Sequence, residues 1–313
     1  MKISVVIPVF NSQLSLRELA ERLKPVLEKV ADEFELILVN DGSKDQSWEV
    51  ICELSAGYPW ICGVDLMRNY GQHNALLRGI RTARYDIVVT MDDDLQNPPE
   101  EIPNLLEKLN EGYDVVYGTP DKEQHGFLRN MASQVTKIAL QGSMSAKIAR
   151  SVSAFRVFRT QLRDVFANYQ CPFISVDVLL TWGTSRFASV PVHQDIRKFG
   201  ESNYSLSQLV AHALNMMTGF STLPLQLASM IGFVFTFFGF GVLAYVVGLF
   251  LIYGRSVPGF AFLSSIIAIF SGAQLFALGI IGEYLARMHF RSMGRPPSVV
   301  RKRTGTFIGQ KEG

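Results

Sequence analysis

Short apolar runs alternate with longer amphipathic segments over residues 1–120. The runs, rich in Val, Ile and Leu, predict strands at residues 3–7, 35–39, 61–66, 87–91 and 114–117. The longer segments, with apolar residues at helical spacing, predict helices at 14–30, 45–56, 74–83 and 99–110. Strands that alternate with helices in this way indicate an α/β fold, with a parallel sheet covered on both faces.

Two long apolar stretches dominate the later part of the chain. Ser202 through Gly254 contains no Asp, Glu, Lys or Arg, and Val257 through Gly282 is a second uncharged stretch. A helix rises about 1.5 Å per residue, so about 20 apolar residues cross a hydrocarbon core of about 30 Å. We therefore predict membrane spans at about 227–253 and 260–282, joined as a hairpin. A buried helix pair in a soluble domain is the alternative.

The segment before the first span has an amphipathic pattern. Leu206 to Met217 repeats apolar residues at intervals of 3, 4 and 7, as in a helix that lies in the membrane interface. The predicted organisation is an α/β domain at 1–204, a juxtamembrane segment at 205–226, the hairpin at 227–286 and a basic tail at 287–313.

The basic residues predict the orientation of the hairpin. Seven Lys or Arg residues follow Glu283 against the single acid Glu312, whereas the connector between the spans carries only Arg255. The positive-inside rule therefore predicts a protein of the inner membrane with both chain ends in the cytoplasm. The net charge of +2 does not indicate nucleic-acid binding. Three cysteines without zinc-like spacing fit reduced cytosolic thiols, and no cleavable signal peptide is expected.

Three consecutive acids, Asp92, Asp93 and Asp94, follow the fourth predicted strand in the stretch TMDDDLQNPPE. Ligands of open α/β sheets bind outside the carboxyl ends of the strands. Closely spaced carboxylates there suit a hard cation such as Mg²⁺ that bridges substrate phosphates. A solvated acidic turn before a helix is the alternative, because Asp and Asn also cap helices.

Polar residues follow the other strands too. Asp41, after the second strand, can accept hydrogen bonds from a base or ribose, although Asp41-Gly42-Ser43 also fits an ordinary turn. His73, after the third strand, fits a capping or interface residue better than a ligand. The turn after the first strand, residues 8–12, lacks the glycines that a nicotinamide-dinucleotide fingerprint requires. A dinucleotide-binding domain is therefore disfavoured.

A family resemblance covers nearly the whole chain. It is carried by the motifs VIPVFNS, VNDGSKD, RNYGQHNALLRGI, MDDDLQNPPEEIP, GYDVVYGT and GIIGEYLAR, in this order and with the terminal hairpin. The chain resembles the polyprenyl-phosphate glycosyltransferases, relatives of dolichol-phosphate mannose synthase in glycosyltransferase family 2. It is most similar to the bacterial subgroup that loads glucose or an aminoarabinose onto undecaprenyl phosphate.

The resemblance implies a GT-A (Rossmann-like) nucleotide-sugar-binding domain and a homotetramer. The implied reaction is inverting transfer of one sugar from a nucleotide sugar, expected to be UDP-linked, to undecaprenyl or another polyprenyl phosphate. The product would serve as a donor for modification of cell-envelope glycan, lipid A or O-antigen. The implied cofactor is Mg²⁺ or Mn²⁺, which offsets charge on the leaving nucleoside diphosphate.

The resemblance also implies roles for individual residues. Those expected to bind the nucleotide sugar are Pro8, Phe10, Asp41, Asp93, Arg197 and Asn203. Those expected to act in catalysis and hold the metal are Asp92 and Asp94, with Gln96 as a further metal ligand. Those expected to hold the acceptor phosphate are Arg129, Ser133, Arg156 and Arg159. Arg129 and Ser133 are four apart, so on a helix they share one face.

Four positions depart from the family pattern. Ser12 stands where Glu is frequent, Pro120 where Arg is, Ala154 where an acid is, and Asn203 where Lys is. These departures leave open a non-catalytic membrane scaffold or transport partner with a degenerate site. A processive polysaccharide synthase is disfavoured, because none of the three tryptophans follows an arginine as its Q-x-x-R-W signature requires.

Overall fold

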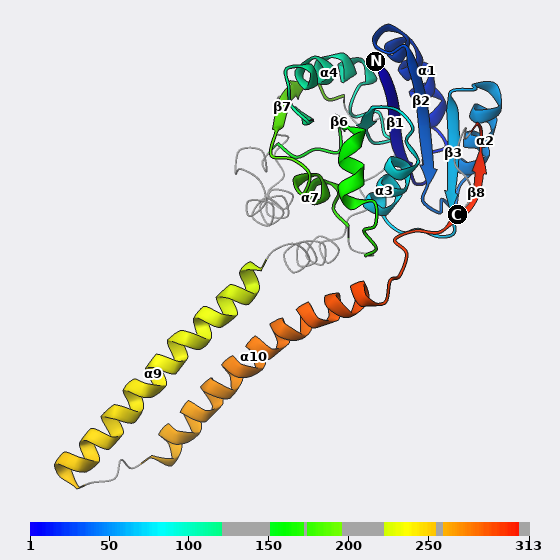
Figure 1. Cartoon of the computed structure of the whole chain (residues 1–313). Helices are drawn as coiled ribbons and strands as arrows, with labels where there is room; N and C mark the ends of the chain where they lie inside the picture. Colours follow the sequence, from blue (N-terminus) through cyan, green and yellow to red (C-terminus); the bar gives the residue numbers. More distant parts are fainter. Residues whose placement is uncertain (121–150, 172–173, 196–221, 255–258, 307–313) are drawn as a thin grey trace. The chain divides into compact units, whose positions relative to one another are not determined.

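The computed structural model describes residues 1–120, 151–171, 174–195, 222–254 and 259–306 (Figure 1). The chain forms two compact units. Unit 1 consists of Met1–Val210 together with Gly294–Gly313, and unit 2 consists of Ala211–Met293. The described residues 294–306 therefore belong to the same unit as the first residues of the chain.

Unit 1 is built on an eight-stranded sheet with the order β7-β5-β6-β4-β1-β2-β3-β8. Six strands run parallel, whereas β6 and β8 run antiparallel to their neighbours. The strands are β1 (Lys2–Val9), β2 (Glu33–Asn40), β3 (Ile61–Leu66), β4 (Ile87–Thr90), β5 (Val115–Pro120), β6 (Arg156–Arg159), β7 (Phe187–Val192) and β8 (Val300–Thr304).

The helices of unit 1 connect these strands. They are α1 (Leu16–Val30), α2 (Ser47–Gly57), α3 (Gln72–Thr82), η1 (Pro99–Glu101), α4 (Ile102–Asn110), η2 (Thr160–Phe166) and α7 (Val176–Thr181). All five strands and four helices predicted before residue 121 are confirmed, with ends shifted by a few residues. Their periodicity is clear because each strand is buried and each helix has one apolar face.

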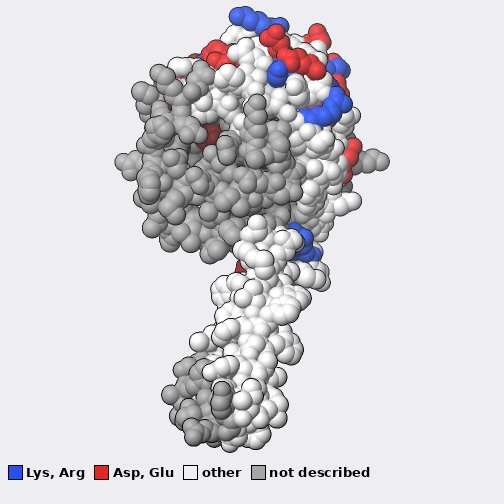
Figure 2. Space-filling model, turned by 90° about the vertical axis from the view of Figure 1, so that its left-hand side faces the viewer, with Lys and Arg blue, Asp and Glu red and all other residues white. Residues whose placement is uncertain are grey.

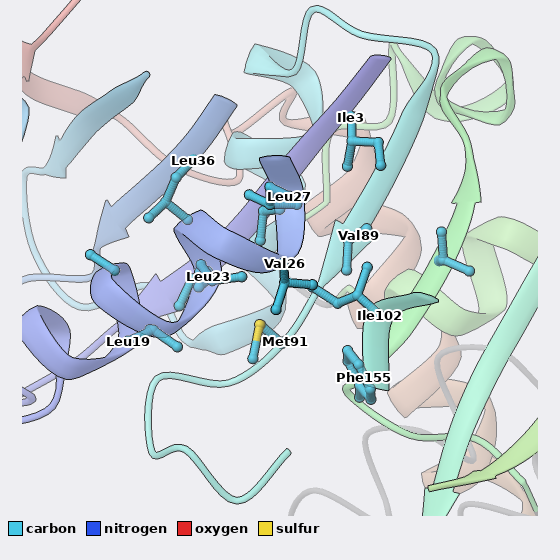
Figure 3. Packing of buried hydrophobic residues seen from close by; sticks show 14 of the residues in the cluster. Ile3, Leu19, Leu23, Val26, Leu27, Leu36, Val89, Met91, Ile102 and Phe155 are labelled. Carbon is cyan, nitrogen blue, oxygen red and sulfur yellow. The ribbon is translucent and has the colours of Figure 1, made fainter. Parts of the chain in front are cut away.

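The main core lies between the sheet and α1, α2 and α4. Alternate residues of β1, such as Ile3 and Val5, belong to the same buried cluster as Leu23 and Leu27 of α1. Figure 3 shows Ile3, Leu23 and Leu27 among the side chains of this cluster. On the opposite face α3 packs closely against β1 and β2. A Cβ added to Gly79 of α3 would lie 2.3 Å from Val6 Cγ1, so only glycine permits this approach.

The five predicted strands, β1 to β5, run in the same direction as expected, but two further strands add antiparallel pairs. Strand β6 enters antiparallel between β4 and β5, and β8 adds an antiparallel edge next to β3. Neither was predicted, because β6 has only four residues and β8 reads VRKRT, which looks like a solvated basic tail. Two-sided burial explains why β1 to β4 were easier to recognise.

Unit 2 contains two long helices, α9 (Leu223–Tyr253) and α10 (Phe260–Ser292). Both contain a segment long and apolar enough to cross a membrane, Leu223–Ile252 and Ile269–Ser292. They pack against each other, with the rings of Phe235 and Phe270 5.5 Å apart. Helix α10 continues ten residues past the predicted end of the second span at 282. The predicted interfacial helix at 206–217 lies outside the described residues.

Candidate active site

Four parallel strands end together at one edge of the sheet, which we call the carboxyl edge. The pairs Val9 with Asn40, Asn40 with Asp65, and Val6 with Thr90 set this alignment of β1, β2, β3 and β4. The loops that follow these strands, here called the exit loops, therefore meet at one place. They carry five of the seven predicted polar site residues that lie in the described part of the chain, namely Asp41, Asp92, Asp93, Asp94 and Gln96.

Asp41 joins the exit loops of β2 and β3. Its carboxylate accepts hydrogen bonds from the backbone N–H groups of Tyr70 (2.7 Å) and Gly71 (2.8 Å), and the residue is 3% exposed. Burial raises the pKa of Asp41 to about 6, despite the opposing effect of these N–H groups and of Arg68. Asp41 therefore holds the two loops together and places a buried carboxylate at the carboxyl edge.

Gly42 allows the same two loops to approach. Its φ is +68°, and an added Cβ would lie 2.6 Å from both Arg68 C and Asn69 N. A side chain at this position would strain the backbone and collide with the β3 exit loop. Glycine is therefore needed in the turn Asp41-Gly42-Ser43 because the β2 and β3 exit loops are in contact there.

Asp93 joins the exit loops of β4 and β1. Its Oδ2 accepts a hydrogen bond from the backbone N–H of Phe10 (3.2 Å). Burial is the main cause that raises the pKa of Asp93 to about 6, while hydrogen bonds from Ser12 and Phe10 lower it. Phe10 itself is 41% exposed, so an aromatic ring is available at the carboxyl edge, whereas Pro8 is buried in β1.

The two other acids of the triplet have separate surroundings. Asp92 Oδ1 accepts a hydrogen bond from Gln72 Nε2 (2.6 Å), and Asp94 Oδ1 accepts one from the backbone N–H of Gln96 (3.1 Å). Within the described residues no three His, Cys, Asp or Glu side chains form a metal-binding group. Two carboxylates still fit Mg²⁺ or Mn²⁺, because such ions complete their shell with phosphate oxygens and water.

Arg156 lies in the interior of unit 1. It is 2% exposed and forms an ion pair with Asp177 of α7. Asp177 Oδ1 also accepts a hydrogen bond from the Tyr117 hydroxyl (3.1 Å). Arg156 therefore belongs to a buried network between β5, β6 and α7.

Arg159 lies at the opposite edge of the sheet. It pairs in register with Ile87 at the start of β4, whereas Arg156 pairs with Thr90 at its end. It forms an ion pair with Asp114, with Arg159 Nε 3.6 Å from Asp114 Oδ1. The structure therefore does not bring Arg159 together with Asp41 and the acid triplet. The predicted residues Arg129, Ser133, Arg197 and Asn203 lie outside the described part of the chain.

Some residues of the site were not assigned from sequence. Gln72 contacts Asp92, and its only signal was its place in the polar stretch after the third strand. Asn11, with φ +55°, bridges the β1 and β2 exit loops: its N–H donates to Ser43 Oγ (3.0 Å), and its Oδ1 accepts from Lys44 N (2.8 Å). Asp177 sits in an apolar run, where a lone acid indicates a buried partner.

The sheet order and the linked exit loops define a GT-A, Rossmann-like α/β domain of the nucleotide-sugar glycosyltransferase class. Residues 4–170, more than half of the 313, match the family model described as glycosyl transferase family 2. The chain belongs to this family.

Solved structures show the same fold. A mycobacterial protein has a TM-score of 0.51 and 20% identity, covering 69% of this chain and 72% of its own. Glucosyl-3-phosphoglycerate synthase from Mycobacterium tuberculosis with phosphoglyceric acid has a TM-score of 0.50 and 18% identity, covering 70% and 80%. The same enzyme with Mn²⁺, UDP-glucose and glycerol 3-phosphate has a TM-score of 0.50 and 19% identity, covering 69% and 78%.

Proposed function

We propose that this glycosyltransferase moves one sugar from a nucleotide sugar, UDP-linked, to undecaprenyl phosphate or another polyprenyl phosphate, with inversion. The observation that carries the proposal is the presence, on one chain, of a family 2 domain and two exposed apolar helices of membrane-spanning length. An acceptor dissolved in a bilayer explains why a sugar transferase has such helices. A soluble acceptor would not require them.

The donor is proposed to bind at the carboxyl edge of the sheet. The exposed ring of Phe10 would stack on the base, and the Asp41 carboxylate would accept a hydrogen bond from the base or ribose. Asp93 would act by fixing the β1 exit loop through the Phe10 N–H. The same loops therefore define the nucleotide pocket and position its polar groups.

Asp92 and Asp94, with Gln96, are proposed to hold Mg²⁺ or Mn²⁺ on the donor diphosphate. The ion would offset the charge that develops on the leaving nucleoside diphosphate. Gln72 holds one oxygen of Asp92, so it would orient that carboxylate toward the ion. Among the described exit loops, the loop after β4 carries the closely spaced carboxylates, and carboxylates are ligands that suit a hard cation.

The acceptor would need little activation. A phosphate monoester has a second pKa near 6, so it is largely dianionic at pH 7. Its oxygen would attack the anomeric carbon as the bond from that carbon to the diphosphate oxygen breaks, which inverts the configuration. Positioning and charge stabilisation would then supply most of the catalysis. Arg129 and Ser133 are the residues proposed to hold the acceptor phosphate, and Arg197 and Asn203 to close over the donor.

The proposed topology keeps the catalytic domain (1–204) and the basic tail (287–313) on the cytoplasmic face of the inner membrane. Residues 205–226 would lie in the interface and 227–286 would form the hairpin. The rationale is the concentration of basic residues after Glu283, compared with the single Arg255 between the spans. The family resemblance further suggests assembly as a homotetramer.

A comparison of acceptors tests the proposal. The full chain in detergent should transfer label from one of a panel of UDP-sugars to undecaprenyl phosphate in a metal-dependent way. Undecaprenol, which has the same chain without phosphate, should not react, and neither should glycerol 3-phosphate, which has phosphate without the chain. Transfer to glycerol 3-phosphate at the same rate would refute a lipid acceptor. Arg129→Ala should raise the KM for the lipid more than the KM for the donor; an equal rise in both would argue against the acceptor clamp.

A further inference from the structure

The C-terminal segment returns to the catalytic unit and pairs with it. Strand β8 runs antiparallel to β3, with Thr304 opposite Gly63 and Val300 opposite Leu66. The pairing continues past the end of β3, because the backbone N–H of Met67 donates to Val299 O at 2.9 Å. The tail therefore reaches the first residue of the β3 exit loop.

Arg301 also binds Met67. Its Nη2 donates a hydrogen bond to Met67 O (2.6 Å), so both backbone polar groups of Met67 are satisfied by the tail. The Arg301 Nε also lies 3.9 Å from Asp65 Oδ2, while Asp65 Oδ1 accepts a hydrogen bond from Asn40 Nδ2 (2.7 Å). One side chain of the tail thus contacts the ends of β3 and, through Asp65, of β2.

Ser298 provides a second attachment. Arg78 of α3 donates to Ser298 Oγ (3.2 Å) and to Ser298 O (2.9 Å), and Ser298 is 2% exposed. Helix α3 begins at Gln72, directly after the β3 exit loop. Residues 298–304, which we call the clamp segment, are therefore fixed to the strand before this loop and to the helix after it.

The loop between these attachments carries the donor-site contacts. Tyr70 and Gly71 donate to the Asp41 carboxylate, and Gln72 donates to Asp92. A shift of the loop at Met67 would change the position of the groups that orient both carboxylates. The clamp segment binds the loop at Met67, and Asp41 binds it at Tyr70 and Gly71.

We infer that the clamp segment is a positioning element of the donor site, and that Arg301 is its positioning residue. Only Met293 to Pro297 separate helix α10 from Ser298, so the chain links the second apolar helix directly to the β3 exit loop. This inference rests on the proposed function in assigning nucleotide binding to that loop. It gives the basic tail a role in substrate binding besides any attraction to lipid.

The test compares Arg301→Ala with Arg301→Lys and Lys302→Ala in the full chain in detergent. Lys302→Ala removes the same charge from the neighbouring residue, for which no hydrogen bond or ion pair to the exit loops occurs in the described structure. Hydrogen exchange at residues 68–72 reports loop position, and the Kd for UDP with Mn²⁺ reports the site. Thermal midpoints verify that each variant is folded.

Arg301→Ala should speed exchange at residues 68–72 and weaken UDP binding by about threefold to tenfold, the range for loss of one hydrogen bond. Arg301→Lys should lie between it and the wild type, and Lys302→Ala should match the wild type. Unchanged exchange in Arg301→Ala, or an equal effect of Lys302→Ala, would overturn the inference. Faster exchange in Arg301→Ala with no UDP binding by the wild type would instead refute the proposed donor site and support the clamp on the loop.

Discussion

Arg156→Met should strongly destabilise the catalytic unit. Arg156 and Asp177 are both nearly inaccessible to solvent, and their ion pair joins β6 to α7. Removing the arginine leaves the Asp177 carboxylate buried with only the Tyr117 hydroxyl as its described side-chain partner. Breaking a buried pair in this way costs about 3–5 kcal/mol. At about 2–4 °C per kcal/mol for a domain of this size, the thermal midpoint should fall by about 6–20 °C.

The double variant Arg156→Met, Asp177→Leu separates pairing from burial. It removes both charges and replaces them with apolar side chains of similar volume, a change that is often neutral or stabilising. The Tyr117 hydroxyl then loses its acceptor, at a cost of about 1–3 kcal/mol, which a third change, Tyr117→Phe, would remove. Thermal unfolding of the full chain in detergent, followed by circular dichroism, measures each midpoint.

The single, double and triple variants together distinguish a structural role of Arg156 from contact with the acceptor phosphate. If its role is structural, the triple variant should recover most of the midpoint and keep the wild-type KM for polyprenyl phosphate. A triple variant with a normal midpoint and a lipid KM raised about tenfold or more would exclude a purely structural role for Arg156. That result would show that Arg156 contacts the acceptor phosphate.

Three further predictions concern the carboxyl edge. Gly42→Ala should weaken UDP binding severalfold, because its φ of +68° and its contact with the β3 exit loop exclude a side chain; unchanged affinity by calorimetry would contradict this. UDP affinity should rise as pH increases through about 6, since Asp41 becomes an ionised acceptor above its pKa of about 6, and Asp41→Asn should flatten part of this rise. Asp94→Asn should abolish transfer while thermal unfolding stays close to wild type; wild-type turnover would exclude Asp94 as a metal ligand.

Four neighbouring strands of the sheet were predictable from sequence because burial leaves a simple signal. Strands β1 to β4 are buried on both faces, so they appear as apolar runs between amphipathic helices. Strand β8 has no such signal, since four of its five residues are polar and it lies at the sheet edge. Its place depends on backbone pairing with a strand more than 230 residues away in sequence.

In the site, too, some residues could be placed from sequence and others could not. Asp41 and the acid triplet were found because parallel strands must end at the same edge, so local position after a strand predicts proximity. Arg156 and Arg159 appeared equivalent in sequence, yet they lie at opposite ends of β6, one buried and one partly exposed. Their difference arises from the direction of β6 and from Asp177, which the local sequence around Arg156 does not contain.

The most direct test of the proposed function is transfer from radiolabelled UDP-sugars to undecaprenyl phosphate by the full chain in detergent. The reaction should be measured with Mn²⁺ or Mg²⁺, with chelator, and with the Asp94→Asn variant in parallel. We expect a single lipid-linked product that appears only with metal and only with the wild-type chain. No lipid-linked product from any nucleotide sugar, under conditions where the chain is folded, would contradict it.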